Sequence, residues 1–152
     1  MKITGGTDPA KRKMTWSLKH GPDRPLTTYV NGATYALCVY DGSSLIARVD
    51  APVDTSCKGQ SCWRATSSSI KYSDRDGTPN GLTSGALKRS NRGETSLKLG
   101  ARGANFAAPS LPMSLPIQAQ LVSDEMNTCF GATYSAAGAK LNSAAGLQAT
   151  SD

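Results

Sequence analysis

The stretch Arg12-Lys-Met-Thr-Trp-Ser-Leu18 decides the fold class of this chain. Apolar Met14, Trp16 and Leu18 alternate with polar residues, and a period of two residues is typical of a β-strand with one buried face. The same alternation returns in residues 116–122. No stretch has an apolar period of 3.6 residues over the length of a helix. The sequence therefore predicts an all-β protein.

Turn signals divide the rest of the chain into further short strands. Asp41-Gly42 ends a run of β-forming residues at 33–40 and precedes a second run at 44–49, a pattern that favours a hairpin. The other expected strands lie at 63–66, 69–73, 86–89, 96–99, 116–122, 128–134 and 141–149, the last being either a strand or a frayed tail. Eight to ten short strands favour a disulfide-stabilised antiparallel β-sandwich, jelly-roll-like in form. We expect a flexible lead-in over 1–10, one sandwich domain over 11–149 and a tail over 150–152.

Composition excludes several classes of protein. The 152 residues fit one domain, and the formal net charge is +6, from 17 Lys+Arg and 11 Asp+Glu. No run approaches the ~20 apolar residues of a membrane span, and coiled-coil heptads are missing. Recurring β-forming clusters argue against a disordered chain. The first eight residues lack the apolar segment of a signal peptide.

Four cysteines indicate the compartment. An even count in a small, Ser/Thr-rich chain suggests two disulfides, for which three pairings exist. Cys57 and Cys62 flank a four-residue loop that can close locally, whereas Cys38 and Cys129 both look like mid-strand positions. We therefore favour Cys57–Cys62 and Cys38–Cys129, which indicates a secreted or cell-surface protein. The alternatives are free buried thiols and a zinc site, although Cys57-x₄-Cys62 has the widest spacing such a site uses.

No catalytic constellation is recognisable, so we expect a protein that is not an enzyme. The chain has no G-x-S-x-G elbow, and its single imidazole, His20, lies in a Gly/Pro-rich loop. Most acidic residues sit at turns, where Asp bonds its own backbone.

One loop predicts a metal site. Tyr72–Gly81 places the oxygen-bearing side chains of Asp74, Asp76 and Asn80 close together with glycines, as Ca²⁺ loops do. Arg75 opposes a cation and no Glu closes the loop, so a plain Asx turn is the alternative. Apart from this calcium hypothesis, no cofactor is expected.

Aromatic and basic residues supply two ligand-binding hypotheses. Trp63, directly after Cys62, could stack with Tyr72 on a sugar face, and the alternative is packing against the disulfide. The group Lys88, Arg89 and Arg92 predicts a patch for an anionic ligand, and the alternative is a solvated surface. Basic residues are scattered rather than interleaved with aromatics on one element, so a nucleic-acid partner is not expected.

Four motifs carry a resemblance: Asp8-Pro-Ala-Lys-Arg-Lys13, Gly32-Ala-Thr-Tyr-Ala-Leu37, Trp63 followed by Ile70-Lys-Tyr-Ser-Asp74, and Cys129-Phe-Gly-Ala-Thr-Tyr134. Together they resemble a group of uncharacterised β-rich modules found near the C-termini of large secreted or surface bacterial proteins. The resemblance spans most of residues 8–149. It implies an extracytoplasmic setting and β structure, and it transfers no catalytic residue.

The leading hypothesis is a non-catalytic extracellular module for adhesion, surface display or self-assembly. Its partners would be cell-surface components or other copies of itself, because Ser/Thr/Ala-rich strands offer low-charge edges that can pair. One alternative is a carbohydrate-binding module that uses Trp63 and exposed tyrosines. Another is a polyanion-binding domain that uses Lys88, Arg89 and Arg92. An enzyme with an unrecognised site is the last.

Overall fold

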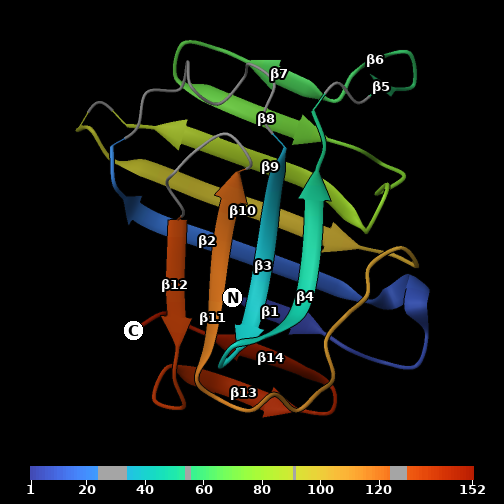
Figure 1. Ribbon diagram of the computed structural model, residues 1–152, viewed down its shortest axis with the longest axis vertical. Helices are drawn as coiled ribbons and strands as arrows, with labels where there is room; N and C mark the ends of the chain where they lie inside the picture. Colours follow the sequence, from blue (N-terminus) through green and yellow to red (C-terminus); the bar gives the residue numbers. More distant parts are fainter. Residues whose placement is uncertain (24–33, 54–55, 91, 124–129) are drawn as a thin grey trace.

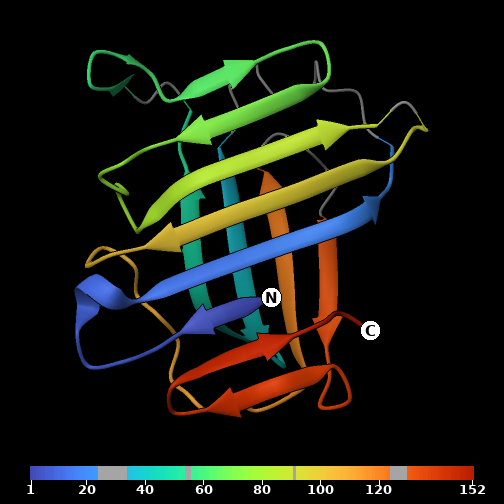
Figure 2. The same ribbon diagram turned by 180° about the vertical axis from the view of Figure 1, so that it is seen from behind.

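The chain forms antiparallel sheets packed face to face, which confirms the predicted all-β class (Figures 1 and 2). The computed structural model describes residues 1–23, 34–53, 56–90, 92–123 and 130–152. Within these ranges the helical structure is limited to one 3₁₀ turn, η1 (Pro9–Lys11), which Asp8 caps by accepting a 3.0 Å hydrogen bond from the Ala10 N–H.

The larger sheet has eight strands, and every neighbouring pair is antiparallel. Strands β7 to β10 follow one another as a meander, and β2 continues the sheet beyond β10 (Figure 2). Across the sheet the order is β13 (Ala139–Ser143), β14 (Gly146–Ala149), β1 (Lys2–Thr4), β2 (Lys13–Gly21), β10 (Thr95–Arg102), β9 (Leu82–Arg89), β8 (Ser69–Ser73) and β7 (Trp63–Ala65).

The smaller sheet has four strands that run steeply across those of the larger sheet (Figure 1). Its order is β12 (Phe130–Tyr134), β11 (Ile117–Ser123), β3 (Tyr35–Asp41) and β4 (Ser44–Ala51). The predicted hairpin at Asp41-Gly42 is confirmed, and Gly42 has the positive φ of 57° that favours glycine in a tight hairpin turn. A two-stranded ribbon, β5 (Ser56–Cys57) with β6 (Gln60–Ser61), stands beside β7.

The core lies between the two sheets and follows from the alternation in the strands. Met14 and Trp16 of β2 face the smaller sheet and are 1% and 0% exposed. From the opposite side, Val39 and Ile117 are fully buried. The polar residues between these positions lie on the outer faces, so one face of the eight-stranded sheet is open to solvent.

The ends of the chain differ from the prediction. The expected lead-in contains β1, because Ile3 fills a core position between β14 and β2. The expected tail is also tied down, since the Asp152 N–H donates to the Thr133 carbonyl at 3.1 Å. The last expected strand is a hairpin of β13 and β14, turning at residues 144–145.

The sheets are also larger than expected. The described residues form fourteen strands rather than eight to ten, because β1, β5, β6 and the final hairpin are short elements with little apolar pattern. Eight strands face four, whereas a jelly roll pairs two four-stranded sheets.

Candidate functional site

Trp63 is packed into the protein rather than presented to a ligand. Its indole N–H donates a 2.8 Å hydrogen bond to the carbonyl oxygen of Pro52. Its ring lies between Tyr35 and Tyr72, at centroid distances of 5.6 and 4.9 Å. Tyr72 is only 2% exposed, so its ring cannot stack on a sugar. These contacts favour the packing alternative for Trp63, which lies half-buried against the core, whereas Tyr72 belongs to the core itself.

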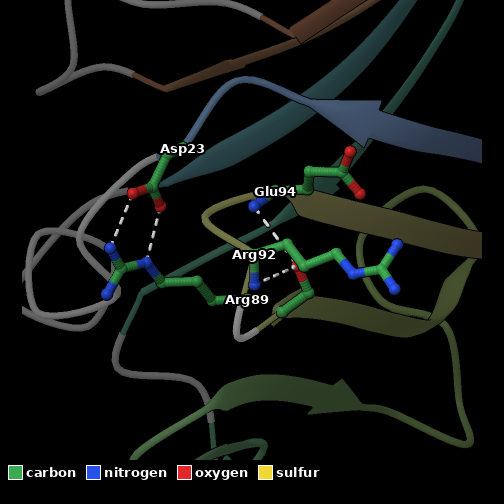
Figure 3. Close-up of polar contacts among 5 residues, drawn as sticks. Asp23, Arg89, Arg92 and Glu94 are labelled. Atoms are coloured by element: carbon green, nitrogen blue, oxygen red, sulfur yellow. Dashed lines mark hydrogen bonds and ion pairs between the residues drawn. The ribbon is translucent and has the colours of Figure 1, made fainter.

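The predicted basic group does not form one patch. Arg89 donates two hydrogen bonds to the carboxylate of Asp23, from Nε at 2.5 Å and from Nη2 at 2.6 Å (Figure 3). This pairing neutralises Arg89. The Arg92 side chain points away from that pair (Figure 3), and Lys88 is exposed on the outer face of β9. The three residues therefore face different surroundings at one end of the β9–β10 hairpin.

The predicted calcium loop is held by its own hydrogen bonds. Asp74 is 4% exposed and accepts from the backbone N–H of Asp76 at 2.9 Å and of Thr78 at 2.8 Å. Burial raises the pKa of Asp74, but the bonds from Thr78 and Asp76 outweigh it and lower the pKa overall. Asn80 accepts from the Asp50 N–H at 2.7 Å, so its amide ties this loop to β4.

These contacts favour the Asx-turn alternative for Asp74, Asp76 and Asn80. Asp76 is exposed, and its carbonyl accepts a 3.1 Å hydrogen bond from the Asn105 amide. In the part of the chain that the structure describes, no three His, Cys, Asp or Glu side chains come together as a metal site requires.

The first predicted disulfide is present. Cys57 and Cys62 are bonded and close the β5–β6 ribbon, with their Cα atoms 5.1 Å apart. Cys38 carries a free, buried thiol in β3. The predicted Cys38–Cys129 bridge is therefore wrong at Cys38, whose thiol is free, and Cys129 lies outside the described residues.

A feature that the sequence analysis did not predict is the segregation of charge. The strands of the eight-stranded sheet contain ten of the chain's 17 Lys+Arg and none of its 11 Asp+Glu. Every strand except β14 contributes at least one cation. The ten are Lys2, Lys13, Lys19, Arg64, Lys71, Lys88, Arg89, Lys98, Arg102 and Lys140.

The register of the strands brings four small residues into a row across the solvent-exposed face of the sheet. Ser73, Ser84, Gly100 and Thr15 lie side by side on β8, β9, β10 and β2. Because these side chains are short, they leave a hollow of about 630 Å³ on the outer face of the sheet. A β-bulge between Gly100 and Ala101 lies in the same hollow.

Cations stand on both sides of this row. Lys98 lies on one side of the hollow, and Arg102, Lys13 and Arg75 lie on the other. The Cα atoms of Lys98 and Arg102, four residues apart on β10, are separated by about 13 Å along the strand. We call this hollow, with its row and its four cations, the basic trough.

The cations of the trough are available to a ligand. Within the described residues, none of the four has an acidic partner at ion-pair distance. The aromatic residues of the eight strands, Trp16, Trp63 and Tyr72, all lie on the inner face. The trough therefore offers positive charge and hydroxyl groups but no ring for stacking.

A second hollow, of about 370 Å³, continues the trough beside the disulfide ribbon. It shares Ser73 and Arg75 with the trough, and it adds three further cations, Lys58, Arg64 and Lys71. The one acidic residue that lines it is Asp76. Positive charge thus extends over β10, β8 and β7 as one surface.

The apolar hollow between the sheets is a weaker candidate for a binding site. It measures about 40 Å³ and is lined by residues such as Leu82, Leu99 and Tyr72. Such a volume admits a few water-sized molecules, and the lining is apolar. It is a small packing space in the core.

Comparison of the chain with protein-family models, curated proteins and solved structures gave no match. No described helix is long and apolar enough to cross a membrane. The geometry of the trough is therefore the basis of the functional proposal.

Proposed function

We propose that this chain is a non-catalytic, extracytoplasmic module that binds an acidic polysaccharide in the basic trough. The observation that carries the proposal is the segregation of charge on the eight-stranded sheet, with ten cations and no acid in its strands. Such a surface attracts a polyanion, and unpaired cations such as Lys98 and Arg102 can each bind a carboxylate or sulfate.

The recess and its chemistry favour a glycan over other polyanions. Hydroxyl groups of Ser73, Ser84 and Thr15 along the row can exchange hydrogen bonds with sugar hydroxyls. Proteins that bind single-stranded nucleic acid stack bases on aromatic side chains, and this face has none. A flat anionic membrane would touch only the tips of the lysines and would leave the recess empty. The Cys57–Cys62 disulfide fits an oxidising, extracytoplasmic setting.

The test is retention on immobilised heparin, with uncharged agarose as the blank. We expect retention at low salt and elution as salt rises, because screening weakens exposed charge pairs. The Lys98→Glu/Arg102→Glu variant should elute well before the wild type. The Arg92→Glu/Lys140→Glu variant changes the net charge equally but leaves the trough intact, and it should elute close to the wild type.

Three results would contradict the proposal. Equal losses in the two double variants would make the retention a net-charge effect. Tighter binding to single-stranded DNA than to heparin, at the same salt concentration, would assign the face to nucleic acid. Stronger binding to vesicles of anionic phospholipid would assign it to a membrane surface.

A different observation favours self-assembly as a second function. Among the described residues, the large hydrophobic side chains that stay exposed are Leu45 and Leu141, whose exposed fractions are 50% and 46%. Leu45 lies on β4 and Leu141 on β13, each an edge strand of its sheet. Exposed edges of this kind can pair with another copy. Light scattering during size exclusion tests this, and a monomer at every concentration would contradict it.

A further inference from the structure

The positions of the cations in the basic trough and in the hollow that continues it carry an inference about which acidic glycan is bound. On β8 and just after it, Lys71 and Arg75 stand on opposite sides of the row. On β10, Lys98 and Arg102 do the same. In each of these two pairs, one cation lies on either side of the row of small residues.

Strand β9 lies between these pairs and has no cation there. Ala86 lies in register between Lys71 and Lys98, and Ser84 lies between Ser73 and Gly100. Neighbouring strands are ~4.8 Å apart, so the two cation pairs are about 10 Å apart with an uncharged strand between them. A sugar residue in an extended chain is about as long as the spacing of one strand.

We propose that the trough binds a linear glycan that runs across the strands and is acidic at every second sugar. This inference rests on the proposed function. An acidic sugar would lie over β8 between Lys71 and Arg75, and the next acidic sugar over β10 between Lys98 and Arg102. A neutral sugar would lie over β9 against Ala86 and Ser84. A chain with a carboxylate on every sugar would leave one carboxylate over β9 without a cation, at a desolvation cost.

The experiment compares two oligosaccharides of six sugars each by titration calorimetry at physiological salt. One is a hyaluronan hexasaccharide, with a carboxylate on alternate sugars, and the other is hexagalacturonate, with a carboxylate on every sugar. We expect the wild type to bind the hyaluronan oligomer at least as tightly, although it has half the charge. Tighter binding of hexagalacturonate would overturn the inference, because it would make charge density the determinant.

An added cation on β9 gives the reciprocal test. Ala86→Lys should raise the affinity for hexagalacturonate about tenfold and the affinity for the hyaluronan oligomer much less, because only the former has a charge above β9. Ala86→Gln is the matched neutral control and should leave both affinities close to those of the wild type. An equal gain for both oligomers in Ala86→Lys would contradict the inference. The wild-type comparison decides the question if Ala86→Lys fails to fold.

Different results would contradict the proposed function and the alternating pattern. If neither oligomer binds and heparin is not retained, the proposed function is wrong. If both bind and hexagalacturonate binds more tightly, the acidic-glycan function stands and only the alternating pattern is wrong.

Discussion

Gly100 and Ser84 face each other on β10 and β9, and a Cβ added to Gly100 would lie 2.7 Å from Ser84 Oγ. The absence of a side chain at position 100 keeps the middle of the basic trough open. Gly100 does not have the positive φ that would require glycine. Its small size, rather than backbone freedom, is what the trough uses.

The Gly100→Val substitution should therefore block binding without unfolding the protein. Valine suits a strand, and the Ser84 hydroxyl can rotate away, so we expect stability to change by less than ~1 kcal/mol. Affinity for an acidic glycan should fall about tenfold or more, because the side chain fills the site. Gly131→Val on β12, where the nearest atom would be 3.6 Å away, is the control that should bind normally. Unchanged binding by Gly100→Val would place the ligand elsewhere.

Trp63 should matter for stability and not for binding. Trp63→Ala removes the bond to Pro52 and the ring contacts with Tyr35 and Tyr72, so chemical denaturation should register a loss of about 2–4 kcal/mol. The folded variant should keep its affinity for the glycan. If Trp63→Ala kept wild-type stability but lost binding, the stacking hypothesis would be restored.

The lowered pKa of Asp74 predicts acid sensitivity of the loop at residues 74–80. Its pKa lies below the usual 3.8 in the folded protein, so the unfolded chain holds the proton more tightly. The stabilisation is complete above about pH 4 and is lost as the pH falls through the folded pKa. Asp74→Asn should be less stable than the wild type at pH 7, and this difference in stability should narrow as the pH falls below 3.8. A gap that stays constant from pH 7 to pH 2 would show that the charge of Asp74 contributes nothing.

The disulfide of the β5–β6 ribbon should be a modest stabiliser. Because it closes a short loop, loop entropy predicts that Cys57→Ser/Cys62→Ser lowers the free energy of unfolding by about 2 kcal/mol. Alkylation of the unreduced, denatured protein should label Cys38 and leave Cys57 and Cys62 unlabelled. An unlabelled Cys38 would contradict the free thiol that the structure shows at this position.

Most of the strands could be predicted from the sequence, because their inner faces are apolar. The alternation of Met14 and Trp16 identifies β2, and the expected strand at 69–73 coincides with β8. β1 cannot be recognised from the sequence, because Ile3 is its one core residue and three residues do not establish a period. β9 and β10 are longer than predicted, since Gly85 and Gly100 weaken the apparent strand signal within them.

The trough was harder to predict, because its residues come from separate strands. The alternation of Ser96, Lys98, Gly100 and Arg102 does signal a basic outer face on β10. Only the register of the sheet places Lys98 on the same line as Lys71, with Ala86 between them. The basic group that the sequence singles out, at Lys88, Arg89 and Arg92, includes Arg89, which is neutralised by Asp23, a residue 66 positions away.

The most direct test of the central claim is to map the binding site by the amide NMR shifts of the labelled protein, titrated with a hyaluronan hexasaccharide. The account predicts that the largest shifts occur on β8, β9, β10 and β2, at Ser73, Ser84, Gly100 and Thr15. Shifts confined to the β9–β10 hairpin end around Arg92, or spread evenly over the surface, would contradict it.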